Sequence, residues 1–403
     1  MELEIPDVFT ERRHLGAGGR QLWQVAGTVG LVALAAAAAL GLAAGDHGRG
    51  FYFGYLVNFA WVLSLSLGAL FFVVLQHLTR AGWSVVVRRV AEAVAGTLPL
   101  VALLLLPVVA GMHQLYHWSH AEAVAADPLL RGKSAYLNVP FFVVRCAVYV
   151  AVWWLLSRFY LGRSVRQDAS GDVGLTLAMQ RRSAPAMLLF AITATFASID
   201  LLMSLDPHWF STIFGVYFFS GSVVSFFSLL ALAAFLLQRS GLLRHLITVE
   251  HYHDLGKLMF SFTVFWAYIA FSQYMLYWYA NIPEETGWFL RRQSGGWGWV
   301  GLLLLFGHFL VPFLLLLARS PKRRPGVLAA VAVWILAMHW VDLHWLVMPE
   351  LRPGAPAPTL LELLLLVGVG GVWLAGVVFV MGRQSLVPER DPRLAESLSF
   401  ENA

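Results

Sequence analysis

Cysteine is nearly absent from this sequence, because Cys146 is the only one among 403 residues. A single thiol forms no disulfide within the chain, and it cannot hold an iron–sulfur cluster, which needs several thiolates. One cysteine also excludes the C-x-x-C-H motif that attaches haem covalently. Electron transfer involving this chain must therefore use quinone, partner proteins or a haem held by histidines.

Charged residues are also scarce, at 13% of the chain, whereas soluble domains usually carry about 25%. The apolar residues form long blocks, and about 20 apolar residues span a bilayer as a helix. Lipid offers no partner for backbone N–H and C=O groups, so the spans must be helical. We predict an all-α membrane protein with ten transmembrane helices at about 21–44, 52–78, 90–112, 138–160, 184–205, 211–237, 256–280, 297–318, 326–348 and 359–382.

The basic residues are distributed unevenly between alternate loops. If the N-terminus is cytoplasmic, 21 of the 28 Lys and Arg residues fall in cytoplasmic segments, 6 fall in outer loops, and Arg145 lies inside a span. The positive-inside rule therefore predicts that both termini are cytoplasmic. The net charge of +5 reflects this topology, so we expect lipid, and no nucleic acid, as a partner.

Spans two to five resemble spans six to nine. A shift of 161 residues superposes Phe53-Gly54 on Phe214-Gly215, and a shift of 142 superposes Asp200 on Asp342. We interpret this order as a parallel internal duplication. The predicted organisation is a cytoplasmic segment (1–20), a flanking helix (21–44), two four-helix bundles (52–205 and 211–348), a second flanking helix (359–382) and a cytoplasmic tail (383–403).

Ionisable residues inside spans are costly, so each is a functional hypothesis. Arg145 and Asp200 lie at similar depth in antiparallel neighbours, which predicts an ion pair between them. Histidines and carboxylates near the outer face could accept protons from a quinol, for example His113 with Asp200, or His339 with Asp342. The candidates for quinone binding or a proton path are Glu92, His113, His117, Arg145, Asp200, Asp206, His208, Asp254, Lys257, His308, His339, Asp342 and His344.

Simpler interpretations remain open for several of these residues. The two aspartates could be structural charges that fix helix packing. Asp254 is expected to be a helix N-cap, and Glu92 is expected to open the third span. His117 and His208 could be solvated loop residues, and His308 with His339 could hold a b-type haem. No metal site and no catalytic residue of the chain itself is predicted.

Three segments resemble a known family. They are DLLMSLDPHWFSTIFG (200–215), HYHDLGK (251–257) and FSQYMLYWYANIPEE (271–285). In this order they resemble the NrfD-like, or PsrC-like, family of integral membrane subunits, and the resemblance covers essentially the whole chain. The family implies ten spans in two four-helix bundles, and a site with a His and an Asp near the outer face. His113 and Asp200 are the nearest matches in placement.

The resemblance also implies a function. It predicts a membrane subunit of a quinol:electron-acceptor (cytochrome c type) oxidoreductase in a bacterial inner membrane, contributing to quinone interaction or proton translocation. The expected partners are a homologous membrane subunit, an iron–sulfur subunit and haem c subunits, which carry the redox cofactors. Two other functions remain open from the sequence, a secondary transporter with parallel repeats and a purely structural membrane anchor.

Overall fold

The structure is a computed structural model that describes residues 10–402. It confirms an all-α membrane protein with ten candidate spans, and no strand occurs among these residues. The unbroken spans are α1 (Gly16–Leu42), α2 (Arg49–Leu78), α9 (Val139–Ser170), α10 (Val173–Leu201), α11 (Phe214–Arg239), α12 (Val249–Ala280), α17 (Pro325–Val347) and α18 (Leu360–Met381). The other two spans are α3 (Val85–Ala95) with α4 (Leu98–Leu104) and α5 (Leu106–Ala110), and α14 (Trp297–Leu303) with η3 (Leu304–Leu310) and α15 (Val311–Leu317).

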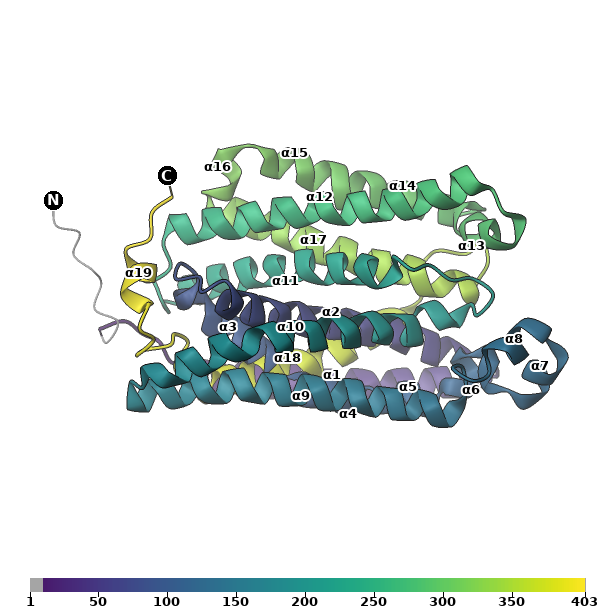
Figure 1. Ribbon diagram of the computed structural model, residues 1–403, viewed down its shortest axis with the longest axis horizontal. Helices are drawn as coiled ribbons and strands as arrows, with labels where there is room; N and C mark the ends of the chain where they lie inside the picture. The colour runs from purple at the N-terminus through teal and green to yellow at the C-terminus, as the bar shows by residue number, and fades with distance from the viewer. Residues whose placement is uncertain (1–9, 403) are drawn as a thin grey trace.

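The spans lie side by side along the long axis, with both ends of the chain at one end of the molecule (Figure 1). Because ten is an even number of crossings, the segments before the first span and after the last span lie on the same side. The opposite end carries α6 (Met112–Leu115), η1 (His117–Ser119), α7 (Ala121–Ala126), α8 (Pro128–Lys133), η2 (Met203–Leu205), α13 (Pro283–Gln293) and η4 (Met348–Glu350). The short helices α16 (Arg319–Lys322) and α19 (Leu394–Leu398) lie at the end with the termini.

Helices α2 and α11 form the centre of the molecule. They pack against each other, and both also contact α10 and α17. Helices α3, α9 and α10 lie on one side of this pair, and we call them the first group of helices. Helices α12, α15 and α17 lie on the other side and form the second group. Helix α2 is almost wholly buried, but α9 is mostly exposed and presents its apolar residues to lipid.

The first and last spans form the most extensive helix pair. Helices α1 and α18 approach closely because glycines face each other, with Gly30 packed on the backbone of Gly371. Small residues allow this approach in membranes, where packing has to replace the hydrophobic effect between helices. The pair also contacts α2, so it flanks the first bundle.

Gly30→Ala is expected to destabilise the protein, because its Cβ would lie 2.6 Å from the backbone nitrogen of Val372. Overpacking of this kind costs about 1–3 kcal/mol. The measurement is thermal unfolding in detergent. The control is Gly27→Ala on the same helix face, where the nearest atom lies at an ordinary 3.4 Å, and equal melting temperatures for the two variants would contradict the prediction.

Several span ends differ from the prediction. The third span begins at Val85 and is divided into three short helices. The second and third of these, α4 and α5, have Pro99 and Pro107 in their first turns. Glu92 therefore does not open this span but lies buried in the third turn of α3, where Arg88 and Arg89 bond it at 3.1 and 3.0 Å. The fourth and fifth spans continue well past the predicted ends at residues 160 and 184, because both are extended helices.

A tight turn joins those two helices. Gly171 adopts a left-handed conformation with φ of 65°, and the side chain of Asp172 accepts the N–H of Gly174 at 2.7 Å to start α10. Glycine followed by aspartate is the expected pattern for a helix stop and restart. The start of α12 was also predicted wrongly, because Thr248 is its N-cap, whereas Asp254 lies inside the helix and pairs with Lys257.

The C-terminal tail covers the end of the molecule where both termini lie. The backbone N–H of Leu386 donates to the carbonyl of Arg13 at 2.8 Å, and Asp391 accepts from Arg88 at 2.5 Å. Further along, Asn402 bonds Lys257 at the start of α12. The tail therefore contacts both groups of helices.

Asp391→Ala is expected to lower the free energy of unfolding by about 1–3 kcal/mol, because it removes a buried partner of Arg88. Thermal unfolding in detergent measures this. The matched control is Glu396→Ala, which breaks an exposed pair with Arg393 worth less than about 1 kcal/mol. Equal losses in the two variants would show that the tail is not anchored through Arg88.

Candidate functional site

The first buried aspartate is part of an ion pair. Arg145 donates from two nitrogens to the two carboxylate oxygens of Asp200 at 2.8 and 2.9 Å, which confirms the predicted pair. The hydroxyl of Tyr149 adds a third donor at 2.7 Å. Arg145 also stacks over the ring of Tyr136, at 3.8 Å from its centroid. Asp200 is fully buried, so its charge is compensated by a bidentate partner inside the span.

The second buried aspartate has a different environment. The hydroxyl of Tyr217 donates to one oxygen of Asp342, and the indole N–H of Trp266 donates to the other at 3.2 Å. Asp342 is 1% exposed. Within residues 10–402 no Lys, Arg or His forms an ion pair with it. Neutral donors therefore hold this carboxyl, and no contacting cation compensates its charge.

The two aspartates thus occupy matching places in the repeat with different chemistry. Each accepts from a tyrosine hydroxyl, but only Asp200 has an arginine. The bidentate arginine compensates the negative charge of Asp200 within the span, and each partner would be buried and unpaired without the other. Asp342 carries no such constraint, so it is the better candidate to take up and release a proton.

Two buried histidines, His308 and His339, lie near the residues that bond Asp342. The ring of His308 packs 4.0 Å from Trp266 and 6.3 Å from His339, measured between ring centroids. Both ring nitrogens of His308 lack a hydrogen-bond partner among the described residues, whereas His339 bonds Ser64 on α2 through Nε2 at 2.8 Å. Since Nε2 of His339 is bonded to Ser64, only Nδ1 of this ring is without a partner among the described residues.

The backbone around His308 is π-helical over Leu304–Leu310. Pro312 lacks the N–H that would bond the carbonyl of His308 in an α-helix, which favours an irregular turn here. Single π-helical turns are frequent at functional sites. The irregular turn brings a buried imidazole with free nitrogens against the ring of Trp266, whose N–H bonds Asp342.

Asp342 with its two donors Tyr217 and Trp266 is called the Asp342 centre below. A cavity of about 730 Å³ adjoins it. Its inner wall includes Tyr217 and Trp266, which are the two residues that bond Asp342. The wall also includes Arg292 of α13 and Trp345 of α17. Its other side consists of exposed apolar residues of α12, α14 and η3, namely Phe271, Leu302 and Leu305. The cavity therefore connects the lipid-facing surface with the residues around Asp342.

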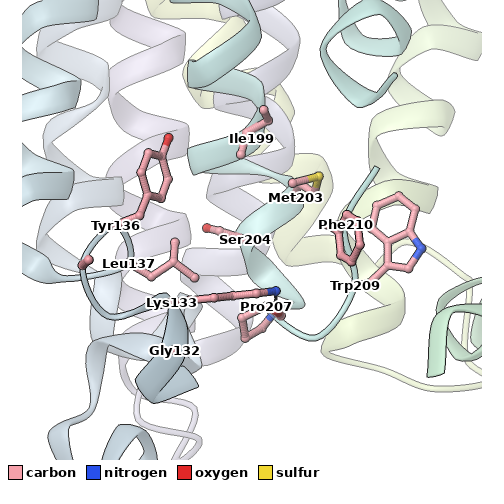
Figure 2. A pocket seen from close by; sticks show the side chains of 11 residues that line it. Gly132, Lys133, Tyr136, Leu137, Ile199, Met203, Ser204, Pro207, Trp209 and Phe210 are labelled. Atoms are coloured by element: carbon pink, nitrogen blue, oxygen red, sulfur yellow. Dashed lines mark hydrogen bonds between the residues drawn. The ribbon is translucent and has the colours of Figure 1, made fainter. Parts of the chain in front are cut away.

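A second cavity of about 530 Å³ lies in the first group of helices, at the end opposite the termini (Figure 2). Lys133 of α8 extends across it and donates to the carbonyl of Pro207 at 2.7 Å. Burial lowers the pKa of Lys133, although Asp206 and Asp127 oppose this shift. The wall also includes Ile199, next to Asp200, and Tyr136, which stacks on Arg145. This cavity holds a lysine already bonded to protein.

The predicted outer residues of the first bundle lie apart from the aspartates. His113 is exposed and bonds Ser119 at 3.0 Å, and no contact joins it to Asp200 among the described residues. His117 is exposed, as the simpler interpretation expected. His208 is also exposed and pairs with Asp127 at 2.6 Å, which lowers the pKa of Asp127. His113 and His208 therefore bond other residues at this end of the molecule, and neither contacts an aspartate of the spans.

The remaining candidates at the end opposite the termini form polar clusters. Asp206 bonds Arg291 of α13, which joins the loop after α10 to the second group of helices. His344 is buried and forms no hydrogen bond with Asp342 among the described residues. Its Nε2 instead contacts the carbonyl oxygen of Pro356 at 3.0 Å. His344 also lies 3.3 Å from Glu362, which pairs with Arg352. His344 therefore belongs to the contact between α17 and α18.

Several residues of the site were not predicted from the sequence. Tyr149 lies one turn after Arg145 on the same helix face, so this partner of Asp200 could have been found from spacing alone. Tyr217, Trp266 and Ser64 come from three other helices, and no local pattern connects them with Asp342 or His339. Arg292 and Trp345 were not among the candidates named from the sequence.

Comparison with known proteins adds no assignment. Neither a protein-family model nor a curated protein matches the chain. The chain is a multi-pass membrane protein. Any function has to be argued from the geometry around Asp342, together with the three sequence segments described above.

Proposed function

We propose that this chain is the ActF-type membrane subunit of an alternative complex III, a quinol:electron-acceptor oxidoreductase of a bacterial inner membrane. In this proposal both termini are cytoplasmic, so Asp200 and Asp342 lie towards the outer face. The ten spans and the excess of basic residues on one side support this orientation. The segments 200–215, 251–257 and 271–285 support the family.

The observation that carries the proposal is the Asp342 centre. A buried carboxyl without a cation, bonded by Tyr217 and Trp266, lies next to a cavity that opens towards lipid. Oxidation of a quinol releases two protons and two electrons. The role proposed for this chain is to accept a proton at Asp342 and to pass it on through His308, whose ring nitrogens are free.

The electrons take another route in this proposal. The single cysteine leaves the chain without the thiolates for an iron–sulfur cluster, so clusters and haem c belong to partner subunits. The expected partners are an iron–sulfur subunit, haem c subunits and a homologous membrane subunit. The present chain then supplies proton transfer and membrane anchoring, and it has no independent catalytic activity.

A secondary transporter has less support. Such proteins often break helices at corresponding places in both repeats. Here the breaks occur in the third span and in the eighth span, but the equivalents of these spans, α12 and α9, are unbroken. Only one of the two aspartates is free of a cation, which also differs from a pair of equivalent transport sites.

The test is purification of the tagged chain from its native membrane in mild detergent. We expect iron–sulfur and haem c signals in the optical and electron paramagnetic resonance spectra, a second ten-span subunit, and quinol-dependent reduction of an electron acceptor. A chain that purifies alone, and that moves a solute in liposomes, would contradict the proposal. A complex whose turnover does not depend on Asp342 would leave only an anchoring role.

A further inference from the structure

The hairpin of α9 and α10 carries a cluster of arginines at the end of the molecule where the termini lie (Figure 1). We call them the hairpin arginines, and they are Arg158, Arg163, Arg166, Arg181 and Arg182. All of them are exposed except Arg163, which is half-buried.

Hydrogen bonds between the two helices fix the level of each arginine. Tyr160 of α9 bonds Ser183 of α10 at 2.9 Å. Closer to the turn, Gln167 bonds Thr176 at 2.7 Å. In this register residues 181 and 182 lie level with residues 162 and 161, between the arginines of α9. Residues 158–166 span about 12 Å along the helix axis, so five positive charges lie within that length.

The carboxylates of the hairpin do not neutralise these charges. Asp168 pairs with Arg89 of α3, and Asp172 accepts a backbone N–H at the start of α10. Within residues 10–402 none of the hairpin arginines forms an ion pair with an aspartate or a glutamate. The cluster therefore keeps its full positive charge.

The contacts of the hairpin arginines leave this charge uncompensated. Arg163 stacks over the ring of Phe159, with 3.7 Å between its guanidinium carbon and the ring centroid. Arg166 donates to the carbonyl of Gly162 in its own helix at 3.2 Å. The charges of Arg166 and Arg182 also repel that of Arg163. An anionic ligand would relieve this repulsion.

The hairpin arginines adjoin an apolar surface. The apolar segments of the two helices end near residue 160 and begin near residue 184, so the arginines lie at the level of the lipid headgroups. Directly beyond them Leu155 and Leu188 are 61% and 67% exposed, and Ile192 is also exposed. A ligand that carries both a negative charge and acyl chains fits this combination, and basic clusters at span ends are a known recognition feature for anionic lipids.

We propose that the hairpin arginines bind the headgroup of an anionic phospholipid, in the leaflet on the side of the termini. The phosphate oxygens accept from guanidinium groups of both helices, whose planar N–H donors match phosphate geometry. The acyl chains lie along the exposed leucines of α9 and α10. This site uses no residue of the Asp342 centre, so it does not depend on the proposed function.

The test is native mass spectrometry of the purified full-length chain with dioleoylphosphatidylglycerol or dioleoylphosphatidylcholine added to the detergent. These lipids share their acyl chains and differ in headgroup charge. We expect the wild type to bind phosphatidylglycerol at least fivefold more tightly. The double variant Arg181→Gln with Arg182→Gln is expected to weaken phosphatidylglycerol binding about tenfold and to leave phosphatidylcholine binding unchanged.

The matched control is Arg239→Gln with Arg244→Gln. It removes two exposed positive charges at the same end of the molecule, from the end of α11 and the turn after it. This variant is expected to bind phosphatidylglycerol like the wild type. Equal weakening in the two double variants would overturn the inference, because the effect would then come from overall charge and not from a site.

Thermal unfolding shows whether each variant is folded. The single variant Arg166→Gln, expected to weaken binding about threefold to fivefold, keeps the test valid if the hairpin double variant does not fold. Equal affinity of the wild type for the two lipids would overturn the inference. Displacement of the lipid by an equal concentration of glycerol phosphate would also overturn it and assign the arginines to a soluble anion. Loss of a protein subunit from the native-membrane complex in the hairpin variant, without a lipid preference, would assign them to an acidic protein.

Discussion

Asp342→Asn is expected to lower quinol-dependent turnover of the assembled complex by about a hundredfold or more. The amide keeps the shape of the carboxyl, since its oxygen can accept from Trp266 and its NH2 can donate to the hydroxyl oxygen of Tyr217, but it cannot take up a proton. Loss of a positioned acid–base group typically costs about 10²–10⁴ in rate. The measurement is quinol:acceptor turnover, together with proton release from liposomes that contain the complex.

Tyr217→Phe is the companion variant, because it removes the bond between the cavity and Asp342 while the carboxyl remains. We expect a smaller loss of turnover than in Asp342→Asn, with assembly of the redox subunits unchanged in both. Unchanged turnover and unchanged proton release in Asp342→Asn would reject proton transfer at this residue. The chain would then serve as an anchor for its partners.

Arg145→Met is expected to destabilise the protein by about 3–5 kcal/mol. Removal of one partner from a buried ion pair leaves the other charge uncompensated, and Asp200 is fully buried. The double variant Arg145→Met with Asp200→Asn is expected to recover a large part of this loss, because no net charge remains buried. Thermal unfolding of the purified chain in detergent measures both.

Tyr149→Phe separates the hydrogen bond from the ion pair. It removes one donor to Asp200 but leaves both bonds from Arg145, so we expect a loss of about 1–3 kcal/mol. The double variant Arg145→Met with Asp200→Asn tests the origin of the loss of stability in Arg145→Met. If the double variant were no more stable than Arg145→Met alone, the loss would come from the missing stacking on Tyr136 and not from an unpaired charge.

The spans could be predicted because composition alone distinguishes lipid-facing segments from loops. The Arg145–Asp200 pair could be predicted as well, since helix rise and antiparallel order place two residues at the same depth. Helix ends were less predictable. Asp254 resembled an N-cap in composition, but Thr248 starts α12 six residues earlier, because the helix extends beyond the apolar segment.

The proton-accepting centre could be predicted only in part. Asp342, His339 and His308 were candidates because ionisable residues inside spans are costly. Their partners depend on the rotation of α11 and α12 about their axes, and an apolar helix in lipid shows too little amphipathic pattern to fix that rotation. For the same reason the sequence paired Asp200 with His113, whereas Arg145 and Tyr149 occupy its carboxyl.

The contact between Gly30 and Gly371 joins the first span of the chain to the last. During synthesis α1 enters the membrane well before α18, because Leu360 of α18 follows Leu42 of α1 by more than 300 residues. Until then the glycine face of α1 has only lipid against it. Messages truncated before α18 will therefore yield nine-span products with an unpaired first helix, and membrane quality-control proteases are expected to degrade them.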